Sequence, residues 1–547
     1  MWSHLDKAWR AWLKPRPFSS LVLASWAKSL LVILGGLAFT FFLMGYWWPY
    51  YRIADMDMFV VYQGFRFNDH LPQDLFDHPG YLTDLLAGGW FHLLHSLGLL
   101  DVQALSDMPN GGSGAESAAG WIAAVRAGRM MSLLLAEGVI LAFALLLRRL
   151  VGDWRVAALG TFAFAFSGGL ATQARILRTE LLSAGFASLA LLILLIAADR
   201  PRLAWRPLLI GLAAFLMTAG MTNKVQAVFL IAVLPLLILA FGRQADEPPK
   251  LEPPGFWQDS RQAIIAAGAA WLIALITAIP AAPLVWTGLA QAPASLNVLR
   301  WHGLPVYQPL LIAWIVGCMI VFARLWRVPA YETLAGIAAL LAGTALGLLL
   351  LDIRYDLGDV VAVINPLEHM AGFAAGDPHL AADHSMFGLG MLAALFGGVL
   401  KLLARMTYFL HSSPRPTIFL EWLVIAMAVA AFRAGERKLV LQVVLLLGAA
   451  FAVDMLGTLR GLKIEYFLYA DPFVIIAAVL LLSRHRDFQL GRWVYQLGSL
   501  FIVLHVAFAM AEPIKSTFRT DVPLDFCVKH FHQTPQIEML PFCPAGT

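Results

Sequence analysis

Separate runs of about 17–25 apolar residues follow one another along most of this 547-residue chain. A run of that length crosses the hydrocarbon core of a bilayer when it forms a helix, since each helical residue advances the chain by about 1.5 Å. The composition agrees, because 60% of the residues are hydrophobic and only 14% are charged. A soluble protein could not bury that much apolar surface. The sequence therefore predicts an all-α polytopic membrane protein.

About thirteen predicted spans satisfy the hydropathy criterion. They lie at 29–49, 130–147, 156–174, 181–198, 207–221, 225–241, 263–287, 308–325, 331–351, 417–432, 438–457, 468–482 and 493–511. The first run lacks a small-residue cleavage site and ends in the aromatic stretch GYWWPY, so we expect a retained helix rather than a signal peptide. A further apolar run at 386–404 is either a span or a helix that lies in the outer interface.

Lys and Arg predict the orientation of these spans. The N-terminal segment and alternate turns are basic, at 148–155, 199–206, 324–327, 433–438 and 483–493. The positive-inside rule places them in the cytosol. The expected organisation is a cytosolic segment at 1–28, a transmembrane domain at 29–511 with outer loops at 50–129 and 352–416, and a short extracytoplasmic tail at 512–547. An odd number of spans then places 386–411 in the outer interface.

The chain has three cysteines. Cys318 lies inside a predicted span, whereas Cys527 and Cys543 lie 16 residues apart in the tail. Two cysteines in a short segment outside the cytosol are compatible with a disulfide, and two unrelated thiols are the alternative.

Several positive charges break the orientation rule, because they fall at the expected outer ends of spans. They are Arg175, Arg178, Lys224, Arg460 and Lys463. A charge near membrane depth is costly unless it is paired. One interpretation is a pocket for a phosphate at the outer leaflet, and the other is pairing with Glu180 or with loop aspartates.

The cation at Lys224 follows a break between two short apolar runs, 207–221 and 225–241. Such short helices do not reach fully across a bilayer, so the sequence predicts a recessed cavity around Lys224. A lysine in that position needs an anionic partner.

Asp55 and Asp57 lie in the stretch RIADMDMF, directly after the first span. A carboxylate at this place can act as a general base toward a hydroxyl or as a metal ligand. On spacing alone, ordinary solvation of a helix end is the stronger interpretation. Acids and cations at the same membrane face together favour group transfer from a lipid phosphate to a hydroxyl.

The order of these features resembles the GT-C superfamily of integral-membrane glycosyltransferases, especially its protein O-mannosyltransferase and aminoarabinose transferase branch. In that family the first span precedes an outer loop with acidic residues and then a His-Pro pair, here His78 and Pro79 in DHPGYL. MTNKVQA is similar to the family's Thr-Lys turn, with Asn223 inserted, and RGLKIEYFLYADP is similar to its late Arg-Tyr-Leu-x-Pro segment. The family commonly has Asp-Glu where this chain has Asp-Met-Asp, which leaves Asp55 and Asp57 as alternative catalytic residues.

The resemblance implies a GT-C-like fold and an inverting transfer of a sugar from a polyprenyl-phosphate donor to a hydroxyl on a protein, glycan or lipid. Asp55 or Asp57 would take the proton of that hydroxyl. The residues implied in binding the donor phosphate are Arg175, Arg178, Lys224 and Arg460. The residues expected to make further substrate contacts are Arg52, His78, Glu180 and Tyr466.

A multispan transporter or lipid flippase is the alternative function. It would more often show two similar halves, and the sequence has no internal repeat. No P-loop, nucleotide-binding glycine motif or metal-ligand spacing of Cys and His is present, and we expect no nucleic-acid partner. The histidines and aspartates of the 352–385 loop, at 369, 377, 379, 383 and 384, leave room for a divalent cation, although solvated loop residues are the stronger interpretation. We expect a bacterial inner membrane, with an endoplasmic reticulum membrane as the alternative.

Overall fold

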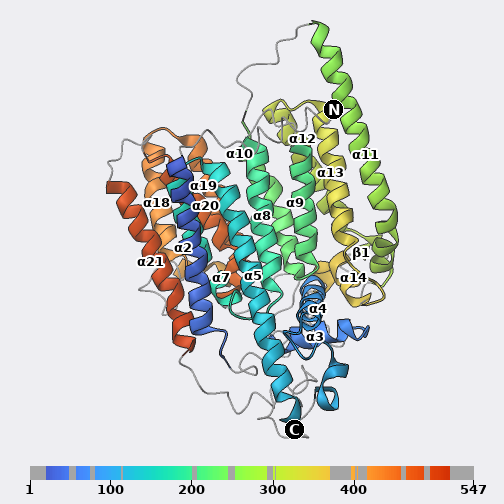
Figure 1. The fold of residues 1–547 in the computed structure, drawn as a ribbon. Helices are drawn as coiled ribbons and strands as arrows, with labels where there is room; N and C mark the ends of the chain where they lie inside the picture. Colours follow the sequence, from blue (N-terminus) through green and yellow to red (C-terminus); the bar gives the residue numbers. More distant parts are fainter. Residues whose placement is uncertain are drawn as a thin grey trace.

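A computed structural model gives the arrangement of the helices (Figure 1). It describes residues 20–48, 57–73, 80–112, 115–199, 206–243, 253–291, 300–301, 304–355, 357–369, 396–400, 403–404, 416–457, 464–485 and 493–517. Within these ranges the only β-structure is a short antiparallel pair, β1 (Arg300–Trp301) and β2 (Leu304–Pro305). The predicted all-α fold is confirmed.

The helices of the first half are α2 (Ser20–Met44), α3 (Phe59–Asn68), α4 (Tyr81–Ser96), α5 (Ala118–Val151), α6 (Trp154–Ala165), α7 (Gly168–Gln173), α8 (Glu180–Asp199), α9 (Arg206–Met221) and α10 (Val228–Phe241). Those of the second half are α11 (Pro253–Ala290), α12 (Tyr307–Trp326), α13 (Ala330–Leu348), α14 (Leu357–Ile364), α18 (Ile418–Arg433), α19 (Arg437–Gly457), α20 (Asp471–Ser483) and α21 (Trp493–Thr517). Short 3₁₀ helices are η2 (Leu105–Asp107), η3 (Pro109–Gly112), η4 (Ala115–Ser117), η5 (Val225–Ala227) and η8 (Ile464–Tyr469).

Seven of the described helices are long and apolar enough to cross a bilayer. They are Ala24–Met44, Ala118–Val151, Glu180–Asp199, Ala267–Ala290, Tyr307–Trp326, Ala330–Leu348 and Trp493–Lys515. Three shorter apolar helices are Arg206–Met221, Val225–Phe241 and Asp471–Ser483. The protein is therefore an integral membrane protein, although the expected number of thirteen spans is not confirmed. Most of the apolar run at 386–404 lies outside the described residues.

The single span predicted over 156–174 is wrong, because the chain forms two helices there, α6 and α7. The Ser167 hydroxyl caps α7 by accepting a hydrogen bond from Leu170 N at 3.4 Å. The turn also brings Gly169 against the backbone of Leu468 in η8. A Cβ at Gly169 would lie 2.7 Å from Leu468 N, so only glycine permits this approach.

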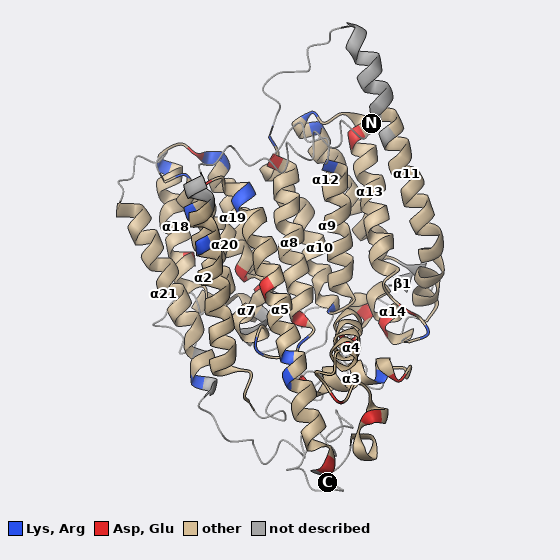
Figure 2. Ribbon diagram, in the orientation of Figure 1, with Lys and Arg blue, Asp and Glu red and all other residues tan. Residues whose placement is uncertain are grey.

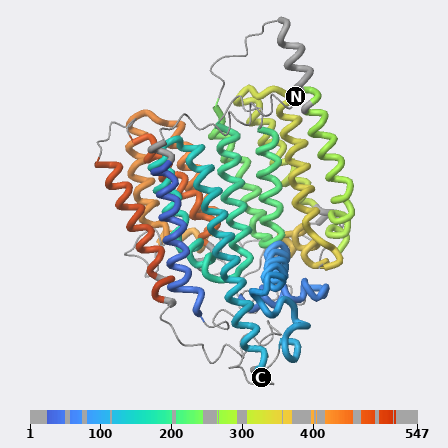
Figure 3. The backbone as a smooth tube through the Cα atoms, viewed as in Figure 1, coloured from blue at the N-terminus to red at the C-terminus, as the bar shows by residue number. Residues whose placement is uncertain are grey.

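α8 lies in the middle of the bundle, between α5 and α9 (Figures 1 and 3), and it is the most deeply buried of the seven long apolar helices. α12 is the most exposed of them, as expected for a helix that faces lipid. α9 packs closely on α13 because glycines lie at their contact: a Cβ at Gly211 would lie 2.9 Å from Ala339 O. Small residues at a helix interface are typical of membrane proteins, where close packing drives association.

The bundle has two distinct ends (Figures 1 and 2). The turn between α18 and α19 lies at one end, where Lys438 Nζ donates a hydrogen bond of 2.6 Å to Gly242 O, just after α10. At the other end, α3, α4 and the turns η2–η4 form a small core of their own around Phe65, Phe91 and Trp121. We call the first the inner end and the second the outer end.

Candidate functional site

The connection between α7 and α8 runs through the protein interior, toward the outer end. Arg175, Leu177 and Arg178 are all buried, and the backbone at 177–178 is not helical. A buried backbone amide without a partner would be costly. The amide of Leu177 is satisfied by a carboxylate instead, because it donates a hydrogen bond of 2.5 Å to Asp57 Oδ1.

Asp57 forms a fully buried ion pair with Arg129 of α5. Arg129 Nη2 and Nε both donate to Asp57 Oδ2, at 2.6 and 2.9 Å, and neither side chain has any exposed surface. Arg129 Nη1 also donates to Gly45 O at 3.2 Å and to Trp48 O at 2.8 Å. The pair therefore joins the end of α2, the start of α3, α5 and the 174–179 connection. Each oxygen of Asp57 already accepts at least one hydrogen bond.

A second buried carboxylate, Glu180, lies at the start of α8 between two cations. Lys224 Nζ lies 2.8 Å from Glu180 Oε1, and Arg178 Nε lies 3.6 Å from Glu180 Oε2. Lys224 has only 2% of its surface exposed, which agrees with the recessed position predicted from the short helices α9 and α10. One carboxylate thus faces two cations in the protein interior.

Arg175 differs from these cations, because none of the described residues supplies a carboxylate partner. Arg175 Nε donates to Ala171 O at 2.7 Å, and its guanidinium lies 5.9 Å from the centre of the Trp48 ring. Arg175 Nη1 has no hydrogen-bond partner in the described part of the chain. Burial lowers the pKa of Arg175 to about 10, which still leaves the group charged at neutral pH. Gly45 is required beside it, since a Cβ there would lie 2.8 Å from Arg175 Cβ.

The turn that carries Lys224 is held by the start of α4. Asn223 Oδ1 accepts hydrogen bonds from both Thr83 N and Thr83 Oγ1, each at 2.8 Å. Asn223, the inserted residue of the Thr-Lys turn, therefore positions the lysine next to it. Just before α4, a Cβ at Gly80 would lie 3.0 Å from Thr179 Cγ2 and 3.3 Å from Asp84 Oδ2. Gly80 and buried Asp84 thus lie beside the same connection.

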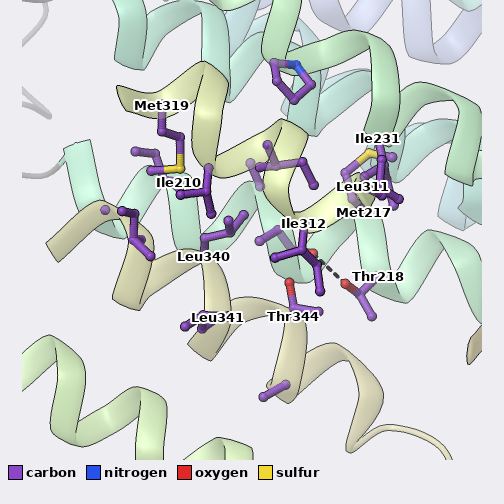
Figure 4. A pocket seen from close by; sticks show the side chains of 18 of the residues that line it. Ile210, Met217, Thr218, Ile231, Leu311, Ile312, Met319, Leu340, Leu341 and Thr344 are labelled. Atoms are coloured by element: carbon purple, nitrogen blue, oxygen red, sulfur yellow. Dashed lines mark hydrogen bonds between the residues drawn. The ribbon is translucent and has the colours of Figure 1, made fainter. Parts of the chain in front are cut away.

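An apolar cavity of about 1130 Å³ begins next to this cluster (Figure 4). α9, α10, α11, α12 and α13 form most of its walls, with side chains that include Ile210, Met217, Ile312, Met319 and Leu340. Met221 and Val228, on either side of the Lys224 turn, line its outer end. Arg206 and Glu332 line its inner end, where Arg206 Nη1 and Glu332 Oε1 form an ion pair of 2.7 Å.

Several of the predicted site residues lie close together in the structure. They are Asp57, Arg175, Arg178, Glu180 and Lys224. Tyr466 lies in η8, which packs on α7 and α8. Six further candidates lie outside the described residues: Arg52, Asp55, His78, Arg460, Cys527 and Cys543.

Three further members of this cluster were not predicted from the sequence: Arg129, Thr83 and Asp84. Arg129 carries a usable signal, because it is a charge one residue before a long apolar run. Thr83 and Asp84 carry none, since a helix start normally contains such residues.

No group of three or more His, Cys, Asp or Glu side chains with the geometry of a metal site occurs among the described residues. The sequence offered the histidines and aspartates of the 352–385 loop as ligands of a divalent cation. Of these, only His369 belongs to the described residues. The cluster around Glu180 therefore consists of one carboxylate and the cations beside it.

Two solved structures are similar to this chain. The oligosaccharyltransferase of Archaeoglobus fulgidus in its apo form has 12% sequence identity and a TM-score of 0.46 over 93% of this chain and 59% of that chain. The archaeal oligosaccharyltransferase AglB from Archaeoglobus fulgidus, in complex with an inhibitory peptide and a dolichol-phosphate, has 13% identity and a TM-score of 0.43 over 95% and 59%. The chain thus spans about 59% of the length of these proteins. No family model and no curated protein matches the sequence.

Proposed function

We propose that the protein is a GT-C glycosyltransferase, of the protein O-mannosyltransferase and aminoarabinose transferase branch, that moves a sugar from a polyprenyl phosphate to a hydroxyl acceptor. The sequence features that resemble this family support the assignment. The proposed organisation is that expected from the charges, with a cytosolic segment at 1–28, a catalytic transmembrane domain at 29–511 and an extracytoplasmic tail at 512–547.

One observation carries the proposal: the buried cation Lys224 lies in the turn between Met221 and Val228, which line one end of an apolar cavity. A polyprenyl phosphate has the same two parts, an apolar chain and an anionic head. Arg175 has no carboxylate partner among the described residues, and Arg178 and Lys224 share Glu180. A phosphate monoanion or dianion would compensate this positive charge through charge-assisted hydrogen bonds.

The transfer step needs a base and a stabilised leaving group. The acceptor oxygen attacks the anomeric carbon and forms the new carbon–oxygen bond, while the bond between that carbon and the phosphate oxygen breaks. The lipid phosphate leaves with the bonding electrons, and the cations stabilise its developing charge. A carboxylate takes the acceptor's proton. Attack opposite the leaving phosphate inverts the anomeric carbon.

We assign the base to Asp55 and a structural role to Asp57. Asp57 accepts hydrogen bonds from Arg129 and Leu177 through its two oxygens, and it is fully buried. An acceptor hydroxyl cannot reach a carboxylate that has no exposed surface and is held by Arg129 and Leu177, so Asp57 fits a structural role. Asp55 lies only two residues before Asp57 in the chain, so we expect it near the same site. Arg52, His78, Arg460 and Tyr466 remain the proposed further contacts to substrate or phosphate.

The proposed site faces the extracytoplasmic side of a bacterial inner membrane, with the N-terminus in the cytosol. The basic turns of the inner end support this orientation. The proposed partners are the lipid-linked sugar, membrane lipids and a hydroxyl on a protein, glycan or lipid.

The test uses the full-length protein in nanodiscs with polyprenyl-phosphate hexoses and pentoses that carry a radiolabelled sugar, together with a membrane extract as a source of acceptors. We expect sugar-free polyprenyl phosphate and a labelled product. A parallel assay in proteoliposomes distinguishes the glycosyltransferase from a lipid flippase, the alternative function. A flippase would move the lipid across the bilayer with the sugar–phosphate bond intact, and that result without product would contradict the proposal.

A further inference from the structure

A buried carboxylate that the mechanism above does not use lies beside Tyr307, which lines the cavity. Glu368, in the helical turn at 366–369 after α14, is completely buried. Its Oε2 accepts a hydrogen bond of 2.6 Å from the Tyr307 hydroxyl, whereas its Oε1 has no hydrogen-bond partner in the described part of the chain. A buried carboxylate oxygen without a donor is unfavourable. The arrangement therefore points to a donor that a ligand brings.

A second acceptor without a donor lies on the residue next to Tyr307. Gln308 Nε2 donates to Asn365 Oδ1 at 3.3 Å and to Ile364 O at 3.4 Å. These contacts orient the amide, and they leave Gln308 Oε1 buried and without a partner among the described residues. Asn365 is itself held by Gly288 O, to which its Nδ2 donates at 2.7 Å. Two acceptors are therefore fixed in place by packed neighbours.

These acceptors lie at the same end of the cavity as Lys224. Trp314 Nε1 of α12 donates to Ala232 O of α10 at 2.9 Å, and Trp326 Nε1 donates to Leu239 O at 3.1 Å. An early residue of α12 thus contacts an early residue of α10, and the last residue of α12 contacts a late residue of α10. The two helices are therefore parallel, and they start at the same level. The first residue of α12, Tyr307, therefore lies at the outer end, as does the Lys224 turn before α10. Tyr307 and Gln308 line the cavity there.

The pair of acceptors fits a ligand group that donates hydrogen bonds. We propose that Glu368 Oε1 and Gln308 Oε1 form a subsite for the ring hydroxyls of the sugar carried by the lipid donor. The proposal rests on the glycosyltransferase function above. A sugar hydroxyl donates readily to a carboxylate or an amide oxygen, and neighbouring ring hydroxyls can reach two acceptors at once. The donor sugar is favoured over the acceptor, because Tyr307 and Gln308 line the cavity at the end next to Lys224, where the phosphate that carries the sugar is proposed to bind.

The experiment measures binding of two kinds of C55 lipid to the full-length protein in nanodiscs. One is polyprenyl phosphate, and the other is the same lipid carrying mannose, glucose, galactose or arabinose. Wild-type protein should bind at least one sugar-bearing lipid more tightly than the sugar-free lipid. Glu368→Gln and Gln308→Leu should each weaken that complex about tenfold or more, since each removes or weakens a hydrogen bond to a sugar hydroxyl. The affinity for sugar-free polyprenyl phosphate should stay unchanged.

The matched control is Glu436→Gln, the same substitution in the turn between α18 and α19 at the inner end, which should change neither affinity. Thermal unfolding checks that each variant is folded, and Gln308→Leu keeps the test decisive should Glu368→Gln fail to fold. A preference for sugar that persists in both variants would overturn the subsite. A variant that raises only the KM for the acceptor would assign these oxygens to the acceptor and overturn the donor subsite. Failure of wild-type protein to bind any polyprenyl phosphate would instead contradict the proposed function itself.

Discussion

At the scale of single residues, the cations of the site fall into two kinds. Lys224 and Arg178 share a carboxylate, Glu180, whereas Arg175 is buried without one among the described residues. Removing one member of a buried ion pair leaves a charge uncompensated, which commonly costs about 3–5 kcal/mol. Removing a cation that has no carboxylate partner leaves no such charge. The two kinds of cation should therefore respond differently to the same substitution.

Arg175→Met and Lys224→Met form a matched pair of variants. Both should weaken binding of polyprenyl phosphate about tenfold or more, since a hydrogen bond to a charged group contributes about 1.5–3 kcal/mol. Only Lys224→Met should also lower the melting temperature in detergent, because Glu180 loses its 2.8 Å partner. Lipid binding in nanodiscs and thermal unfolding measure the two effects. Full affinity in Arg175→Met would exclude this residue from the phosphate site.

At the scale of helices, the cavity depends on close contact between α9 and α13. Glycines permit that contact, and a Cβ at Gly343 would overlap Gly211 O. The site depends equally on the break between α6 and α7, because Gly169 packs against Leu468. Small residues thus set the positions of the elements, while the charged residues determine what the elements hold.

Gly343→Ala should lower the melting temperature, since overpacking a tight contact costs about 1–3 kcal/mol. Gly317→Ala on α12 is the control, because a Cβ there would meet nothing within 4 Å. In an open helical position Ala is favoured over Gly by about 0.5–1 kcal/mol, so this variant should be as stable as wild type or more stable. Equal melting temperatures for the two variants would show that the α9–α13 contact is looser than described.

Most of the helices can be predicted from the sequence, because their formation depends on neighbouring residues. Apolar runs predict the long helices, and the polar turn at 222–224 predicts the break between α9 and α10. The break between α6 and α7 was not predicted, and the contact that it permits, between Gly169 and Leu468, joins residues about 300 positions apart. The Asp57–Arg129 pair likewise joins residues 72 apart. The sequence predicts that these charges lie near the outer face, but only tertiary contacts decide which charges pair.

At the scale of the whole molecule, the two ends of the bundle should lie on opposite sides of the membrane. The turn between α18 and α19 lies at the inner end, and η2–η4 lie at the outer end (Figure 1). The basic residues of the first turn predict that the inner end faces the cytosol.

Cysteine labelling in intact cells measures this orientation. Asn110→Cys and Ala434→Cys, both at exposed positions, are introduced separately into a background with Cys527 and Cys543 replaced by Ser. A membrane-impermeant maleimide should label Asn110→Cys in intact cells and Ala434→Cys only after lysis. The reverse pattern would place the proposed site in the cytosol and contradict the proposed orientation.

In the proposed mechanism Asp55 supplies the base, and Asp57 holds the site together. The most direct measurement compares Asp55→Asn with Asp57→Asn for sugar transfer, binding of the lipid donor and thermal stability. Asp55→Asn should lower turnover by about 10²–10⁴-fold, because an amide cannot take the acceptor's proton, with donor affinity and melting temperature unchanged. Asp57→Asn should lower the melting temperature, because it leaves Arg129 buried without its carboxylate. Full transfer activity in Asp55→Asn, with a melting temperature equal to wild type, would show that Asp55 is not the base.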